Sequence, residues 1–270
     1  MNVITDAEFT QFQQFIFDAA GITISSAKKM MVCGRLSKRL LALGMETYTQ
    51  YLELLGSGNA RDEVQTAIDL LTTNETYFFR ESKHFDLLGR LARNAAQHSQ
   101  PLRVWSAACS TGEECYSMAM TLADQMGDAG WEILGTDISA TVLGRARIGH
   151  YSLSRTQYIP QDYLKRFCLK GHGEQEGTLL VDRELRRRVN FAQVNLNATL
   201  PRLGSFDAIF LRNVLIYFSR ETKRDVVARV LSHLKPGGYF CIGHSESLQD
   251  VNATLNPIAP AIFQKPASRP

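Results

Sequence analysis

The chain has 270 residues, of which 44% are hydrophobic, and this is enough for a large core plus a smaller module. The composition excludes a disordered protein, and the formal net charge of +3 is too small to indicate nucleic-acid binding by itself. Apolar runs of about 18 residues and a signal-peptide pattern are both missing from the sequence, so we expect a cytoplasmic protein without membrane insertion.

Five cysteines are scattered along the chain, and no two of them are spaced as C-x-x-C. This spacing favours neither a disulfide framework nor a zinc site. We therefore expect reduced, mostly buried thiols and no metal. The five residues are Cys33, Cys109, Cys115, Cys168 and Cys241.

The first part of the chain, residues 1–72, is predicted to be a small helical domain. Thr5 and Glu8 form a capping-box pattern before a first helix that should end at Gly21. Apolar residues at helical spacing continue after this glycine. The further helices are expected at residues 25–44, from Thr47, and at about 59–71.

The second predicted helix carries a row of basic residues, and no acidic residue lies between Ala27 and Gly44. Such a row is either a solvated face or a docking surface for an acidic helix of a partner. The basic residues are Lys28, Arg35, Lys38 and Arg39.

The stretch from Arg103 to Asp137 predicts a strand, a tight turn, a helix and a second strand, which together form a βαβ unit. The turn contains Ser110-Thr111-Gly112, and the second strand ends at Asp137. In nucleotide-binding sheets a carboxylate roughly 20 residues beyond the turn accepts hydrogen bonds from ribose hydroxyls. The unit therefore predicts a site for a nucleoside.

The turn lacks the full glycine pattern of a dinucleotide site. Glu113 and Glu114 open the helix at the point where a phosphate would otherwise bind. Two acids there suit a cationic ligand, and S-adenosylmethionine carries both a sulfonium and an amino group. The alternative is that both residues only stabilise the helix N-terminus through its dipole.

Two later strands, at residues 189–196 and 206–213, also end in polar side chains. Ligands of open α/β sheets bind outside the carboxyl ends of the strands, so these side chains should converge on one crevice with the turn. A turn at residues 236–238, a strand at 239–244 and an edge strand at 261–263 should complete the sheet. The converging residues are Asp137, Asn195, Arg212 and Asn213.

Short strand-like runs at residues 178–182 and 186–191 do not follow this β–α alternation. They predict a small antiparallel β insertion at about 166–190. Its three successive arginines, residues 186–188, either discourage strand pairing at an edge or contact a partner.

Five motifs, in this order, closely resemble the chemotaxis receptor methyltransferases, the CheR family. The resemblance covers essentially the whole chain. It implies an α/β fold in which residues 73–270 form a Rossmann-like S-adenosylmethionine methyltransferase sheet, with the N-terminal helical module and the small β insertion. The motifs are T-T-N-E-T-Y-F-F-R-E (72–81), W-S-A-A-C-S-T-G-E-E-C-Y-S (105–117), T-D-I-S (136–139), F-D-A-I-F-L-R-N-V-L-I-Y-F (206–218) and L-K-P-G-G-Y-F-C-I-G-H-S-E-S (234–247).

The resemblance implies methyl transfer from S-adenosylmethionine to glutamates on the cytoplasmic domain of chemoreceptors. The products would be glutamate 5-O-methyl esters and S-adenosylhomocysteine, and the role would be sensory adaptation. Arg80 and Tyr217 would lie beside the transferred methyl group, and the family usually has proline where Cys115 stands. The cofactor-binding residues implied by motif position are Asn74, Thr76, Arg80, Glu114, Asp137, Asn195, Leu196, Arg212 and Asn213.

A glutamate with a pKa of about 4.3 is already ionised at neutral pH, so this transfer needs no general base. His84 and His244 are therefore expected to be structural. Tyr217 could instead be an aromatic core residue, and a receptor tether on the β insertion is left open. The alternative functions are a methyltransferase for nucleic acid or a small molecule, against which the modest charge argues, and a non-catalytic cofactor-binding adaptor.

Overall fold

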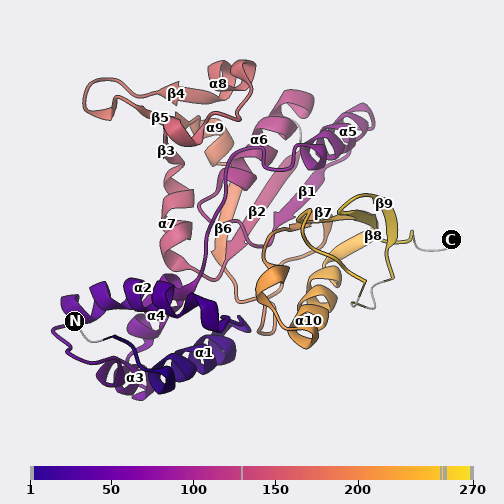
Figure 1. The fold of residues 1–270 in the computed structure, drawn as a ribbon. Helices are drawn as coiled ribbons and strands as arrows, with labels where there is room; N and C mark the ends of the chain where they lie inside the picture. The colour runs from indigo at the N-terminus through magenta and orange to yellow at the C-terminus, as the bar shows by residue number, and fades with distance from the viewer. Residues whose placement is uncertain (1–2, 129, 250, 252–253, 268–270) are drawn as a thin grey trace.

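The computed structural model describes residues 3–128, 130–249, 251 and 254–267. Figure 1 shows three parts: the N-terminal helices, a central sheet with helices on its faces, and a small sheet at the end of the molecule opposite the N-terminal helices. Among the described residues, no helix is both long and apolar enough to cross a bilayer. The helices are α1 (Asp6–Ala20), α2 (Lys29–Ala42), α3 (Tyr48–Gly56), α4 (Arg61–Leu71), α5 (Lys83–Gln97), α6 (Glu113–Met126), α7 (Ala140–Ile148), α8 (Gln161–Phe167), α9 (Arg183–Arg186) and α10 (Arg220–Leu231).

Within the described residues, the central sheet has seven strands in the order β6-β2-β1-β7-β8-β10-β9. The first five of these strands pair in parallel, and β10 runs antiparallel to β8 and β9. Their carboxyl ends therefore meet at one edge, as predicted for an α/β fold. The strands are β1 (Leu102–Ser106), β2 (Trp131–Asp137), β6 (Val189–Gln193), β7 (Phe206–Leu211), β8 (Leu234–Ile242), β9 (Asn256–Ala259) and β10 (Ile262–Gln264).

The two faces of the sheet are buried by different helices. In β1, Val104 packs in the core that α5 and α6 cover, whereas its neighbour Trp105 packs in the core that α10 covers. This alternation follows from the period of two residues in a strand. Trp105 is fully buried, and its indole Nε1 donates to the hydroxyl of Thr136 at 2.9 Å. The strand that precedes the predicted turn, β1, is therefore packed against helices on both of its faces.

Two of the N-terminal helices, α1 and α3, begin as their capping residues predict, whereas α2 begins at Lys29 without a side-chain cap. Thr5 and Glu8 form the predicted capping box at α1, and the C-cap Gly21 adopts a left-handed φ of 72°. Thr47 caps α3 through a second box with Gln50. A core of its own holds α1 to α4 together, with Phe12 fully buried at its centre. The helical prediction for this region is confirmed.

Two of the four basic residues predicted as a row on α2 bond within the fold. Arg35 donates to the carbonyl oxygens of Leu70 and Thr72, at 3.2 and 2.7 Å, and so caps the end of α4. Arg39 pairs with Glu63 on α4, with Nε donating to Oε1 at 2.9 Å. These two arginines therefore face α4, and Lys38 is exposed.

Replacing Glu63 with glutamine is expected to lower the free energy of unfolding by about 1–2 kcal/mol at pH 7. Glu63 also accepts from the Tyr51 hydroxyl at 2.6 Å. Its hydrogen bond with Arg39, opposed by burial, holds the pKa of Glu63 below the usual 4.5. A carboxyl pKa lowered by folding stabilises the native state above about pH 4.5, and this contribution disappears as the pH falls through the folded pKa. Urea unfolding at pH 7 and at about pH 3 measures the difference between parent and variant, which should close in acid.

The matched control is Glu53→Gln, because Glu53 is exposed on the neighbouring α3. It should change the free energy of unfolding by less than about 0.5 kcal/mol at either pH. If the free energies of unfolding of Glu63→Gln and the parent differ by the same amount at both pH values, this result would contradict the assigned ion pair.

The small antiparallel sheet has the order β3-β5-β4 and differs from the sequence prediction in its limits. Its first strand, β3 (His150–Ser152), lies before the predicted start at residue 166. The run at residues 186–191 is not a strand of this sheet, because α9 ends there and β6 joins the central sheet instead. The remaining strands are β4 (Cys168–Lys170) and β5 (Thr178–Val181).

Two predictions near the C-terminus are wrong. The predicted turn at residues 236–238 lies inside β8, where the pairing with β7 shifts register and Gly237 has a φ of 76°. The predicted edge strand corresponds to β10, which lies inside the sheet because β9 pairs along its outer side. The cysteine prediction is confirmed: all five thiols are free, and three are buried.

Candidate functional site

A cavity opens at the carboxyl ends of β1, β2 and β7 and encloses about 1040 Å³ of empty space, its open mouth included. The structure brings ten of the predicted site residues to its wall, and Glu113 is not among them. The helical domain supplies part of the same wall, which the sequence did not predict. The predicted residues are Asn74, Thr76, Arg80, Glu114, Asp137, Asn195, Leu196, Arg212, Asn213 and Tyr217, and the unpredicted ones from the helical domain include Ile22, Thr23, Lys28 and Met31.

The turn after β1 is held by the carboxylate at the end of β2. Asp137 accepts hydrogen bonds from the backbone N–H groups of Ser110 at 2.9 Å and Ser139 at 3.0 Å. Burial raises the pKa of Asp137, and these hydrogen bonds oppose the rise. Gly112 ends the turn with a φ of 95°, and a Cβ there would lie 2.9 Å from the Cβ of Ala146. Glycine at this position therefore lets the turn pack closely against α7, while Ser110 at the start of the turn lines the cavity.

The two glutamates that open α6 have different surroundings. Glu114 lines the cavity and accepts from the Ser106 hydroxyl at 2.6 Å. Glu113 does not line it, since its side chain is fully buried against Thr111 and Arg155, at 2.6 Å from each. Burial raises the pKa of both carboxyl groups. The prediction that Glu113 meets a cationic ligand is wrong, because consecutive helical residues point about 100° apart.

A buried arginine joins three segments around the cavity. Arg212 follows β7, and its Nη1 lies 2.6 Å from Oε2 of Glu114 while its Nη2 lies 3.0 Å from Oε2 of Glu81. It also donates to the backbone carbonyl of Arg80. Burial lowers the pKa of Arg212, but the two carboxylates raise it by more, so the pKa of Arg212 lies above its usual value. The ion pairs therefore hold the segment that carries Arg80 against the strand ends.

The two predicted catalytic residues, Arg80 and Tyr217, both line the cavity. In the sequence, Arg80 precedes Arg212 and Tyr217 follows it. Arg80 is half-buried, donates to the carbonyl of Glu75 at 3.0 Å and lies 5.6 Å from the ring centroid of Tyr77. Tyr217 belongs to a 3₁₀ turn, and Lys28 Nζ lies 5.2 Å from its ring centroid. In that turn the fully buried residue is Leu215, whereas Tyr217 is only half-buried.

The helical domain and the strand ends are bonded directly to each other. Asn195 donates from Nδ2 to the carbonyl of Ala19 at 2.7 Å, and Thr23 donates its N–H to the carbonyl of Tyr217 at 2.8 Å. Ile22 and Phe218 form an antiparallel bridge beside this contact. The helical domain therefore closes one side of the cavity.

Glu246 is a residue of the site region for which the sequence analysis predicted no role. Its carboxylate accepts from the backbone N–H groups of Gly243 at 2.6 Å, Leu215 at 2.7 Å and Asn213 at 2.9 Å. Asn213 has a left-handed φ of 58°, and these bonds hold that conformation. The signal was present, since Glu246 lies in the G-H-S-E-S run, but two of its three backbone partners, Asn213 and Leu215, are about 30 residues away in the chain.

Comparison with known families gives two matches that together span nearly the whole chain. Residues 7–72 match the model "CheR methyltransferase, all-alpha domain", and residues 74–261 match "CheR methyltransferase, SAM binding domain". The chain belongs to the CheR methyltransferase family.

Among the relatives of this CheR chain is the chemotaxis protein methyltransferase of Escherichia coli (strain K12), 44% identical over 90% of this chain and 85% of the relative. The chemotaxis protein methyltransferase of Salmonella typhimurium is 43% identical over 92% of this chain and 86% of the relative. Chemotaxis protein methyltransferase 2 of Pseudomonas aeruginosa is 39% identical over 96% and 93%, respectively. The similarity therefore extends over both matched domains.

The donor set of this CheR cavity fits S-adenosylmethionine, which the matched domain description names. Both Asp137 oxygens keep a lone pair beyond their backbone partners, and these can accept from a ribose diol. Glu114 would provide an acceptor for the amino end, and Ile138 and Leu196 would provide an apolar wall for the base. The acids at the helix N-terminus would repel a pyrophosphate instead.

Replacing Asp137 with asparagine is expected to weaken S-adenosylhomocysteine binding by about 10- to 100-fold, or about 1.5–3 kcal/mol. The change removes the negative charge and replaces one acceptor with a donor. Isothermal titration calorimetry measures the affinity. Asp69→Asn is the matched control, because Asp69 likewise accepts from backbone N–H groups, those of Ala140 and Thr141, but lies outside the cavity. Equal affinities for Asp137→Asn and the control would remove Asp137 from the ribose site.

Proposed function

We propose that this chain is a chemotaxis protein methyltransferase that modifies chemoreceptors. It transfers a methyl group from S-adenosylmethionine to receptor glutamate side chains, and gives glutamate 5-O-methyl esters and S-adenosylhomocysteine for sensory adaptation. The observation that carries the proposal is one cavity lined by Asp137, Glu114, Arg80 and Tyr217 in a chain of the CheR family. Since the receptor segments in question are cytoplasmic, we place the enzyme in the cytoplasm.

When bound, S-adenosylmethionine supplies a methyl group activated by its sulfonium. The residues of the chain must then bind and orient the acceptor. Arg80 attracts the receptor carboxylate, and the hydroxyl of Tyr217 holds it in line with the methyl group. No side chain has to remove a proton, because the acceptor is already ionised at neutral pH. Alignment alone can supply several kcal/mol, on the order of 7 in favourable models.

The wall formed by the helical domain assists this alignment. Lys28 and Met31 stand at the cavity from α2 and the turn before it, and they exclude water from one side. A dry site favours the reaction, since a cation and an anion become neutral products. We therefore propose that residues 1–72 form a helical domain with a catalytic task as well as a docking one, and that residues 73–270 form the transferase domain.

A receptor helix would dock across α2 in this proposal. Because Arg35 and Arg39 bond to α4 and Lys28 lies over the Tyr217 ring at the cavity, Lys38 is the exposed member of the four predicted basic residues that an acidic partner can contact. Exposed Met30 and Leu41 on the same helix add apolar contact area. The proposed partner is the cytoplasmic domain of methyl-accepting receptors.

A methyl-transfer assay with labelled S-adenosylmethionine and several receptor cytoplasmic fragments tests the proposed function. Base-labile label on a receptor, mapped to glutamates, is the expected result. Label on nucleic acid or a small molecule would indicate a different methyltransferase. Binding of receptor and cofactor without transfer would indicate an adaptor, and either result would overturn the proposal.

A further inference from the structure

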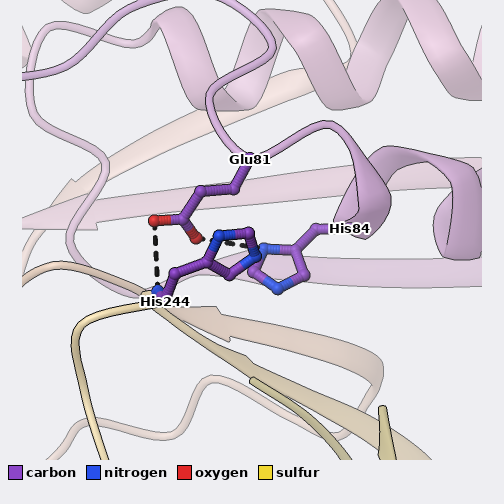
Figure 2. A group of neighbouring side chains, drawn as sticks. All are labelled: Glu81, His84 and His244. Carbon is purple, nitrogen blue, oxygen red and sulfur yellow. Dashed lines mark hydrogen bonds and ion pairs between the residues drawn. The ribbon is translucent and has the colours of Figure 1, made fainter. Parts of the chain in front are cut away.

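Three side chains beside the cavity form a cluster, of which the proposed methyl transfer uses only Glu81, through its ion pair with Arg212. Glu81 lies two residues before α5, His84 lies in its first turn and His244 follows the end of β8, so the group joins segments about 160 residues apart. One ligand atom from each residue lies within 4.8 Å of the other two. Figure 2 shows the carboxylate and both imidazole rings gathered at one point.

His84 has no partner that explains its burial. Its side chain is fully buried, and neither ring nitrogen has a hydrogen-bond partner in the part of the chain that the structure describes. Nδ1 lies 3.6 Å from Oε2 of Glu81, which is too long for a hydrogen bond. An unpaired buried polar group costs about 1–3 kcal/mol, so a ligand is a physical reason for its position.

The carboxylate of the cluster is held in place by surrounding donors. The N–H of His244 donates to Oε1 of Glu81 at 3.1 Å, and Nε of Arg212 donates to Oε2 at 3.3 Å. Asn213 Nδ2 lies 3.4 Å from Oε1. Such outer contacts orient a ligating carboxylate.

The charge around the cluster favours a cation in spite of Arg212. Glu81 and Glu114 both pair with this arginine, so two negative charges face one positive charge. The local sum is −1 when both imidazoles are neutral. The His244 side chain is exposed, so an ion can enter from solvent and keep water as a further ligand.

We propose that Glu81, His84 and His244 form a binding site for a divalent transition-metal ion of the zinc class. Two imidazoles and one carboxylate, with an open position, suit zinc and its neighbours better than magnesium or calcium, which prefer oxygen ligands. A bound ion ties the start of α5 to the end of β8, directly beside Arg80. The sequence did not predict it because its ligands are E-x-x-H and a single histidine far away in the chain.

Calorimetric titration of the full chain with ZnCl₂ tests the site, with MgCl₂ as the comparison ion. A second measurement is the visible absorption of bound Co²⁺, which is intense when the ion has four ligands. The informative variant is His244→Ala, because this side chain is exposed, its ring makes no hydrogen bond or ion pair within the described part of the chain, and it lies outside the cavity. The matched control is His172→Ala, an exposed histidine in the loop between β4 and β5.

The expected result is one equivalent of Zn²⁺, with at least about 10-fold weaker binding in His244→Ala and parental binding in His172→Ala. The Co²⁺ band should be lost only in the first variant, and MgCl₂ should give no heat. Absence of Zn²⁺ binding in the parent, or equal affinity in His244→Ala and the parent, would overturn the site. Methyl transfer is not the readout, so this outcome is independent of the proposed function.

Discussion

Arg212→Met is expected to lower the free energy of unfolding by about 3–5 kcal/mol at pH 7 and to remove measurable cofactor binding. The side chain of Arg212 is 2% exposed, and those of Glu81 and Glu114 are 12% exposed. Removal of the guanidinium leaves two carboxylates close together without a counter-charge. The backbone carbonyl of Arg80 loses its donor as well, so the segment that carries Arg80 is released. Urea unfolding and calorimetry with S-adenosylhomocysteine measure the two effects.

The double variant Arg212→Met with Glu114→Gln separates charge from packing. Glutamine removes one of the two carboxylates left without a counter-charge, so it should recover part of the lost stability. Burial already raises the pKa of this carboxyl group. Arg187→Met is the control, since Arg187 and Glu184 form a pair with side chains 55% and 70% exposed. That control should cost at most about 1 kcal/mol. If Arg212→Met lowers the free energy of unfolding by no more than Arg187→Met does, the buried ion pairs do not stabilise the fold.

Local sequence signals predicted the elements whose ends are decided locally. The capping boxes at Thr5 and Thr47 and the left-handed Gly21 lie within one helical turn of the groups they satisfy. The buried parallel strands could also be recognised, because a strand covered on both faces is continuously apolar, as Phe206–Leu211 is. The position of the cavity at the strand ends can therefore be predicted from these local elements alone.

Elements stabilised by distant partners were missed. β3 has three residues, and it exists because His150 and Tyr151 pair with Leu180 and Leu179 of β5. The edge strand β9 is exposed throughout and contains Pro257, which argues against a strand in sequence but is tolerated at an edge. Neither has an apolar alternation of its own. Their pairing depends on chain segments that sequence reasoning cannot bring together.

The site was predicted where polar side chains end parallel strands, because the sheet itself brings those ends together. Asp137, Arg212 and Asn213 follow this rule. Glu113 and Glu114 have the same chemistry, and only the rotation of the helix separates their environments. Glu246 acts through three backbone N–H groups, a contact that leaves no mark on side-chain patterns. Sequence therefore predicts which groups line the cavity better than which groups hold that lining in place.

Arg80→Ala is expected to lower the turnover number for receptor methylation on the order of 100-fold, with a smaller change in cofactor affinity. Arg80 is held at the cavity wall by its bond to the carbonyl of Glu75, so its charge is available to an incoming carboxylate in a fixed place. Tyr217→Phe keeps the ring under Lys28 and removes only the hydroxyl, so about a 10-fold loss is expected. Initial rates at saturating cofactor, with calorimetry for affinity, separate these effects.

A matched control for the first variant is Arg90→Ala, because Arg90 is exposed on α5 and does not line the cavity. It should methylate receptor at the parental rate. Arg80→Lys adds a second discrimination: it retains the charge but not the planar two-donor geometry, so it should fall between the parent and Arg80→Ala. If Arg80→Ala and Tyr217→Phe both methylate receptor at the parental rate, neither residue orients the acceptor, and alignment must come from the docked receptor helix itself.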